Sequence, residues 1–327
     1  MQQEITEQPK PREYLFDNYK VFLIILVVIG HFIEPCYDQN SYLYELKWAI
    51  VAFHMPAFIF ISGYFSKKTP SLRKLLGGLV IPYFVYEIIY YLLYTLILHK
   101  KTGLYLARPK FSLWYLMALF AWRVLATLVR KIPGYLIWTT ILGLLIGFVG
   151  LDNFLSIPRI VYFFPFFLAG MDFETEWLDR FRNKRGFAGA LAILAGLTVF
   201  LFTDKYHDQL TPYIFYGRYS YQEMDMGNVQ GVLIRMVCYL ISFLLIYLFM
   251  LVLPREKKSY SYLGQRTMAI YIFHGMIYSA IKYKTSLLTA VNTNVESMLL
   301  ILFCLLLVWV LSRKPFVRVT DRISHLI

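Results

Sequence analysis

An apolar stretch near the start of the chain, DNYKVFLIILVVIGH at residues 17–31, carries ionisable side chains at both of its ends. Asp17 and Lys20 lie at one end and His31 at the other. Eleven positions separate Lys20 from His31, which in a helix places both on one face about 16 Å apart. Ionisable residues are costly inside a membrane, so their presence favours a function. Lys20 could grip an anionic ligand while His31 transfers protons, or Lys20 could only extend to the lipid headgroups.

Other ionisable residues are expected at a similar depth in neighbouring apolar segments. His54 and His274 should lie near the level of His31, where they could orient a base or stabilise an oxyanion. His54 stands just before Pro56, so it could instead only bond a carbonyl group that the proline frees. Three further ionisable residues are expected to be buried in the apolar segments, and each could belong either to the site or to a structural ion pair: Glu87, Arg123 and Arg159.

The composition identifies the environment of these segments. Of 327 residues, 58% are hydrophobic and 16% charged, which is typical of a polytopic membrane protein. We expect an all-α transmembrane helical bundle of about ten spans in one membrane domain, residues 15–313, between a polar tail at 1–14 and a basic tail at 314–327. The expected spans are 15–34, 48–65, 75–98, 111–129, 132–150, 154–170, 187–202, 229–253, 260–281 and 295–312.

The distribution of positive charge predicts the orientation. With the N-terminus inside, the tails and alternate loops hold 19 Lys and Arg, against 9 in the opposite loops, which favours both termini in the cytoplasm. The net charge of +13 then reflects loop bias, and no nucleic-acid partner is expected. The three cysteines are widely spaced and predict neither a metal site nor a disulfide framework.

Five motifs in order along nearly the whole chain resemble those of the acyltransferase-3 family of bacterial membrane acyltransferases, within it the fucose 4-O-acetylase-like subgroup. They are FDNYKVFLIILVVIGH, FHMPAFIFISGYFSKK, FSLWYLMALFAWRVL, RIVYFFPFFLAG and YLGQRTMAIYIFHG. The resemblance implies a multi-pass protein of the bacterial plasma membrane. It also implies transfer of an acyl group, usually acetyl, from cytoplasmic acyl-CoA to a hydroxyl of an envelope or exported glycan. Many members carry Arg where this chain has Lys20, which keeps the charge but loses the bidentate fork for phosphate.

This chemistry suggests a role for each candidate. His31 could act as the general base that takes the proton of the attacking hydroxyl, or it could accept the acyl group and relay it. His54, His274 and Asp17 complete the candidate catalytic set. No metal and no resident cofactor are expected, since acyl-CoA is a co-substrate.

Substrate-binding residues are expected on both sides of the membrane. Cations that could clamp the phosphates of acyl-CoA are Lys20, Lys67, Lys68, Arg73 and Lys74, although such a basic turn could also be only a topology signal. The connection at 204–228 should face a glycan or lipid-linked saccharide. Its candidate acceptor-binding residues are Tyr216, Tyr219, Arg218 and Glu223, although tyrosines here could also form an interfacial aromatic belt.

Two other classes of protein fit parts of the sequence. A polysaccharide exporter or flippase would also combine about ten spans with intramembrane charges, and a small-molecule sensor is a third class. The sequence lacks the duplicated halves that transporters often have, and a layer of histidines suits catalysis better. The expected partners are the bilayer, acyl-CoA and a saccharide acceptor, and the sequence leaves the oligomeric state open.

Overall fold

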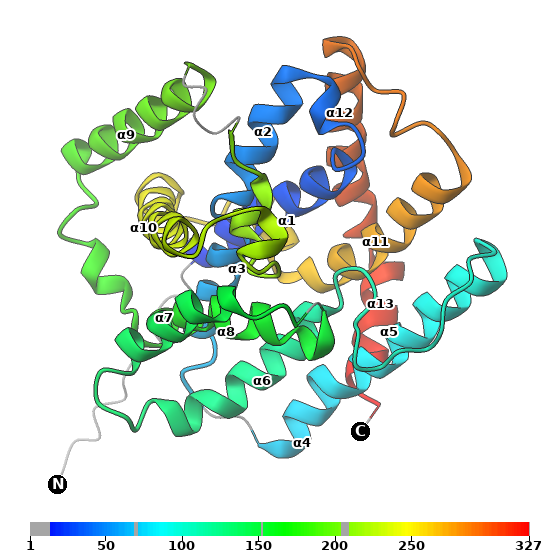
Figure 1. Cartoon of the computed structure of the whole chain (residues 1–327), viewed down its shortest axis with the longest axis horizontal. Coiled ribbons are helices and arrows are strands. Elements are labelled where there is room, and N and C mark those ends of the chain that lie inside the picture. The colour runs from blue at the N-terminus through cyan, green and yellow to red at the C-terminus, as the bar shows by residue number, and fades with distance from the viewer. Residues whose placement is uncertain (1–13, 69–70, 152, 204–208, 327) are drawn as a thin grey trace, which may run out of the picture.

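The computed structural model describes residues 14–68, 71–151, 153–203 and 209–326, and over these residues the chain is helical without a strand (Figure 1). The predicted tail at 1–14, apart from Tyr14, and the first residues of the predicted acceptor loop lie outside this description. The α-helices are α1 Leu15–Phe32, α2 Ser41–Val51, α3 His54–Tyr64, α4 Leu72–Leu75, α5 Ile81–Leu92, α6 Trp114–Val129, α7 Tyr135–Leu145, α8 Ile157–Asp172, α9 Lys184–Thr203, α10 Asn228–Val252, α11 Thr267–Lys284, α12 Asn294–Leu311 and α13 Lys314–Ser324.

Seven helical segments of the described chain are long and apolar enough to cross a membrane. They are Leu15–Phe32, Ser41–Tyr64, Leu72–Ile97, Phe154–Asp172, Lys184–Thr203, Asn228–Val252 and Asn294–Leu311. The segments Trp114–Val129 and Tyr135–Phe148 are apolar but shorter, and α11 is not among the seven. The all-α class is thus confirmed, while the count of ten spans and the cytoplasmic termini stay predictions. The predicted basic tail forms α13, which packs against α5 and α11.

Helix α1 lies in the interior of the bundle, whereas α9 lies at its edge (Figure 1). In α1, 72% of the apolar window is buried, compared with 6% in α9. The helices around α1 include α3, α10, α11 and α12. A helix that is apolar all round is stable only when it is surrounded, by protein or by lipid. Protein surrounds α1, which therefore has a fixed position from which its two ends can carry functional side chains.

The second predicted segment is broken into α2 and α3 just before Pro56. Because proline has no N–H, the carbonyl of Ala52 loses its helical donor. Ser242 Oγ donates to that carbonyl at 2.6 Å, and His54 Nδ1 lies 2.7 Å from the carbonyl of Ile50. The break therefore places His54 at the first position of α3. There it lines the same cavity as His31, which lies at the C-terminal end of α1.

Helices α3 and α8 cross with their backbones in contact, because each contributes a glycine at the crossing. A Cβ added to Gly63 would lie 1.9 Å from the carbonyl oxygen of Phe167. A Cβ added to Gly170 would likewise lie 1.9 Å from the carbonyl oxygen of Phe60. Small residues at such positions allow membrane helices to approach closely. This crossing holds α3 in place beside α1.

Replacing Gly63 with alanine should lower the thermal unfolding midpoint of the purified protein in detergent. The added methyl group would force the two helices apart, and overpacking of this kind typically costs about 1–3 kcal/mol. Gly189→Ala in α9 is the matched control, because its Cβ would meet no atom within 4 Å. This control should leave the midpoint unchanged or slightly higher. An unchanged midpoint in Gly63→Ala would contradict the close crossing.

Candidate active site

His31 lies in the last turn of α1, where its neighbour Gly30 allows α2 to pack closely. A Cβ on Gly30 would lie only 3.1 Å from a methyl group of Ile50. The imidazole of His31 packs against the rings of Phe111 and His274, with centroids 4.7 and 5.4 Å away. The end of α1 therefore holds a titratable ring at a junction of three segments that are distant in sequence.

Two more histidines lie close to this ring. His274 on α11 is fully buried, and its Nδ1 lies 2.9 Å from Ile270 O, as His54 Nδ1 lies 2.7 Å from Ile50 O. A carbonyl only accepts hydrogen bonds, so Nδ1 carries the hydrogen in both rings, and in a neutral ring Nε2 then keeps its lone pair. Within the described chain, Nε2 of His274 is buried without a hydrogen-bond partner. Such atoms are few in folded proteins and often mark functional sites.

A cavity of about 220 Å³ follows one face of α1 from Lys20 to His31 and is called here the Lys20 cavity. Its walls come from α1, α3, α6 and α11 and are mostly apolar. Lys20 forms an ion pair with Asp17 at 3.0 Å, and Arg123 Nε donates to Ser66 Oγ at 3.0 Å. The cavity thus offers a long apolar path with cations at the end remote from His31.

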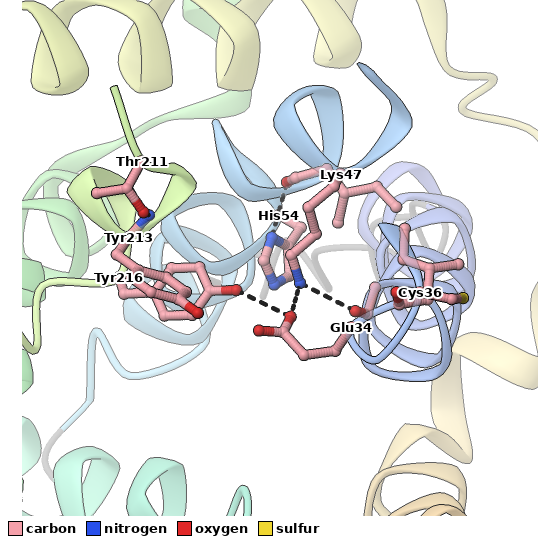
Figure 2. A network of polar contacts seen from close by, with 10 residues as sticks. Glu34, Cys36, Lys47, His54, Thr211, Tyr213 and Tyr216 are labelled. Carbon is pink, nitrogen blue, oxygen red and sulfur yellow. Dashed lines mark hydrogen bonds and ion pairs between the residues drawn. The ribbon is translucent and has the colours of Figure 1, made fainter. Parts of the chain in front are cut away.

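A second cavity of about 390 Å³ extends from His31 to the loop that carries Tyr216 and is called here the Tyr216 cavity. Figure 2 shows a polar network on its wall, in which Lys47 Nζ contacts Glu34 Oε2 and also donates to Gly30 O at 3.0 Å. The Tyr216 hydroxyl donates to the same carboxylate at 3.1 Å. Burial and the Glu34 carboxylate raise the pKa of Tyr216 well above its usual value, which keeps the hydroxyl protonated. The network ties the loop to the end of α1.

The two cavities meet around His31. Five of the described residues line both of them: Val27, His31, Met55, Ser112 and Trp114. Lys20 lines the first cavity but not the second, and Tyr216 lines the second but not the first. The two residues lie beyond opposite ends of the region that both cavities share. Two ligands, one in each cavity, would therefore approach the same imidazole from opposite directions.

The structure gathers only some of the predicted residues around these cavities. Arg123 lines the Lys20 cavity beside Lys20. The predicted site residues that line the Tyr216 cavity together with His31 are His54, Arg159, Tyr216, Arg218 and Tyr219. His274 packs on His31 from behind, outside the lining of either cavity.

The predicted cationic turn lies beyond the Lys20 cavity. Lys67 pairs with Glu174 at 2.8 Å, and the other three predicted cations, Lys68, Arg73 and Lys74, are exposed. Asp17 stands fourteen positions before His31, which is about 21 Å along the helix. Asp17 therefore holds Lys20 in place and does not contact His31.

Glu223 and Glu87 do not line the Tyr216 cavity, but their carboxylates accept hydrogen bonds from residues of the loops around it. The carboxylate of Glu223 accepts from the N–H and the hydroxyl of Ser220 at 2.7 and 2.8 Å. The buried carboxylate of Glu87 accepts from the N–H of Lys110 at 2.6 Å, and the ammonium of Lys110 lies 3.5 Å away. This pair fixes the segment that leads to Phe111.

Several residues of the site were not predicted from the sequence. Glu34 and Lys47 looked like ordinary loop residues, and Phe111 and Ser112 were only part of the FSLWYL motif. Phe111 has a φ of 48°, a left-handed conformation that is rare for a bulky side chain and recurs at functional sites. Ser112 lines both cavities, and within the described chain its buried Oγ has no hydrogen-bond partner. A polar residue at the edge of a motif was the one signal that could have found Ser112.

The fold and the site define a helical membrane protein with an internal site that two cavities reach. A sequence model of the acyltransferase domain family Acyl_transf_3 matches residues 13–313. The chain therefore belongs to the acyltransferase-3 family and is a membrane acyltransferase. It is also similar to the nodulation protein NolL of Sinorhizobium fredii (strain NBRC 101917 / NGR234), with 43% identity over 61 residues, 18% of this chain and 17% of NolL. The match thus spans less than a fifth of that relative, and no solved structure matches the chain.

Proposed function

We propose that the protein is an O-acyltransferase of the bacterial plasma membrane that transfers an acyl group, in the simplest case acetyl, from cytoplasmic acyl-CoA to a hydroxyl of an envelope or exported glycan. The observation that carries this proposal is the position of His31, which lines both cavities at their meeting point. A titratable ring at that point can serve a donor on one side and an acceptor on the other.

The donor is assigned to the Lys20 cavity. The mostly apolar path suits the extended pantetheine arm, with the thioester near His31 and the phosphates towards Lys20 and Arg123. Charge-assisted bonds from ammonium and guanidinium groups are the usual means of holding phosphate. Asp17 keeps Lys20 on the cavity face through their ion pair at 3.0 Å.

The acceptor is assigned to the Tyr216 cavity. Tyr216 and Tyr219 line this cavity, and the ring of Tyr213 packs against both, with centroid distances of 5.2 Å to Tyr216 and 5.0 Å to Tyr219. Aromatic rings with a polar tip offer both a flat apolar face and hydrogen bonds, which is the combination that a saccharide needs. Contacts remote from the reacting atoms then orient the hydroxyl for attack.

In the proposed reaction, the acceptor oxygen attacks the thioester carbon and the C–S bond breaks. The proton of the hydroxyl passes to His31 and then to the departing CoA thiolate. His274 Nε2, an acceptor without a partner among the described residues, is suited to accept a hydrogen from the His31 ring. That contact would fix which nitrogen acts as the base. A covalent relay through His31 would use the same arrangement.

Incubation of the purified protein with labelled acetyl-CoA tests this function. The expected result is release of CoA, with the label recovered on an added glycan or as free acetate from hydrolysis of acetyl-CoA. A folded protein that binds glycan but never cleaves acetyl-CoA would favour the exporter or flippase instead. Glycan analysis of cells with and without the gene would then identify the natural acceptor.

Replacing Tyr216 and Tyr219 together with alanine should reduce transfer to the glycan on the order of tenfold, because the orienting contacts are lost. Binding of CoA and slow hydrolysis of acetyl-CoA should persist, since neither residue lines the Lys20 cavity. Tyr216→Phe is the milder partner variant and removes only the hydrogen bond to Glu34. Parallel loss of CoA binding in the folded double variant would show that the loop supports the bundle rather than the acceptor.

A further inference from the structure

Ser112 is buried, but its hydroxyl takes part in no hydrogen bond within the described chain. Nearby serines behave differently. Ser62 Oγ donates to Phe58 O at 3.0 Å, and Ser66 Oγ donates to Ser62 O at 2.6 Å. Burying a hydroxyl without a hydrogen bond costs free energy, so the state of Ser112 needs another explanation, such as a contact with a bound substrate.

The main chain around Ser112 is held from two sides. The N–H of Lys110 donates to the buried Glu87 carboxylate at 2.6 Å, and the N–H of Leu113 donates to Lys110 O at 3.1 Å. The carbonyl of Ser112 itself accepts from the hydroxyl of Tyr271 on α11. These contacts fix the backbone, so the position of the Ser112 side chain is set before a substrate binds.

Ser112 also lies at the meeting point of the two cavities. It follows Phe111, whose ring packs against His31 with a centroid distance of 4.7 Å, and it lines both cavities. Besides His31, the lining shared by the cavities has two side chains that can donate, the hydroxyl of Ser112 and the indole N–H of Trp114. Of these two donor atoms, only Ser112 Oγ is buried without a partner among the described residues. A thioester beside His31 would therefore have an uncommitted donor close to it.

We infer that the Ser112 hydroxyl donates a hydrogen bond to the carbonyl oxygen of the thioester and stabilises the negative charge that this oxygen gains during acyl transfer. This inference rests on the proposed function, because it takes the Lys20 cavity as the donor site.

The hydroxyl of Ser112 is neither acylated nor deprotonated in this step. When the acceptor oxygen attacks the thioester carbon, the electron pair of the C=O double bond moves onto the carbonyl oxygen. When the C–S bond breaks, that double bond forms again, and the proton held by His31 passes to the CoA thiolate. A donor positioned in advance at the atom where charge develops stabilises the transition state more than the bound substrate.

Replacing Ser112 with alanine should lower the rate of CoA release from acetyl-CoA on the order of a hundredfold. The rate is measured on the purified full-length protein, with water as the acceptor and with envelope glycan extracted from cells that lack the gene. Equilibrium binding of CoA, which has no thioester carbonyl, should stay close to that of the wild type. The thermal unfolding midpoint shows whether the variant is folded.

Two further variants control for burial and volume. The hydroxyl of Ser156 is also buried without a partner in the described part of the chain, but Ser156 lines neither cavity. Ser156→Ala should therefore leave the rate unchanged. Ser112→Cys keeps nearly the same volume with a much weaker donor, so it should lose most of the rate. A normal rate in Ser112→Cys would mean that the side chain only fills space.

A substrate analogue separates a direct contact with the carbonyl oxygen from a structural effect. In dithioacetyl-CoA, sulfur replaces that oxygen, and sulfur is a weak hydrogen-bond acceptor. Ser112→Ala should slow the reaction of acetyl-CoA much more than that of dithioacetyl-CoA, whereas a structural defect would slow both equally.

Three results would overturn the inference while leaving the proposed function intact. They are a normal rate in folded Ser112→Ala, equal losses with the two thioesters, and an acetyl group found on Ser112 itself by mass spectrometry. A wild-type protein that never cleaves acetyl-CoA would instead refute the proposed function, and the inference with it. The activity of the wild type thus distinguishes the two failures.

Discussion

Replacing His31 with alanine should lower the rate of acyl transfer by a factor on the order of a hundred or more. His31 lines both cavities, and no other titratable residue of the described chain does so. The substitution removes the group that takes the hydroxyl proton, or the group that carries the acyl chain in a relay. The measurement is single-turnover release of CoA from labelled acetyl-CoA in the presence of saturating acceptor.

The controls for this experiment separate catalysis from folding. His325→Ala makes the same change on an exposed ring at the end of α13 and should leave the rate unchanged. CoA binding and the thermal unfolding midpoint of His31→Ala should stay close to those of the wild type. A folded His31→Ala protein that transfers acyl groups at nearly the normal rate would remove His31 from the reaction.

Removing both cations of the Lys20 cavity should weaken CoA binding on the order of a hundredfold. Each charge-assisted contact to phosphate contributes about 1.5–3 kcal/mol, so Lys20→Ala with Arg123→Ala removes at least two such contacts. In the wild type, affinity should fall as salt is raised, because contacts at the mouth of the cavity are screened. Equilibrium binding of CoA at low and high salt provides the measurement.

Substitutions in the neighbouring basic turn complete this test. Lys67 and Lys68 lie just beyond Phe65, which lines the Lys20 cavity, and Lys67 is already paired with Glu174. Their replacement should therefore weaken CoA binding less than the double variant does. If neither salt nor any of these substitutions changes the affinity for CoA, the donor enters the protein elsewhere.

The long apolar segments made the helices predictable, because hydrophobic runs of this length have few other stable structures in a membrane. The ends of the helices were harder to predict. The ninth span was expected to begin at residue 260, but Ser261–Gln265 form a short 3₁₀ helix and α11 begins at Thr267. A Cβ on Gly264 would lie 2.1 Å from the carbonyl oxygen of Asp17, so this turn is shaped by contact with α1.

The candidate site was predictable where its residues share one helix. Lys20 and His31 follow from the period of α1, since eleven positions bring two side chains to one face. The contact of Tyr216 with Glu34 could not be predicted, because it depends on how a loop nearly two hundred residues away folds over the end of α1. The contact of Phe111 with His31 likewise depends on the Glu87–Lys110 ion pair, which joins two separate segments.

The meeting of the two cavities also bears on membrane energetics. If the two cavities open on opposite faces of the membrane, the residues at their meeting point form part of its permeability barrier. The aromatic and aliphatic side chains of Val27, Met55 and Trp114 around His31 then have to stop the leak of protons and ions that an open channel would allow. The acyl group would cross this barrier only as it is transferred from the CoA sulfur to the acceptor oxygen. CoA would stay on its own side of the membrane, and the electrochemical gradient would be kept.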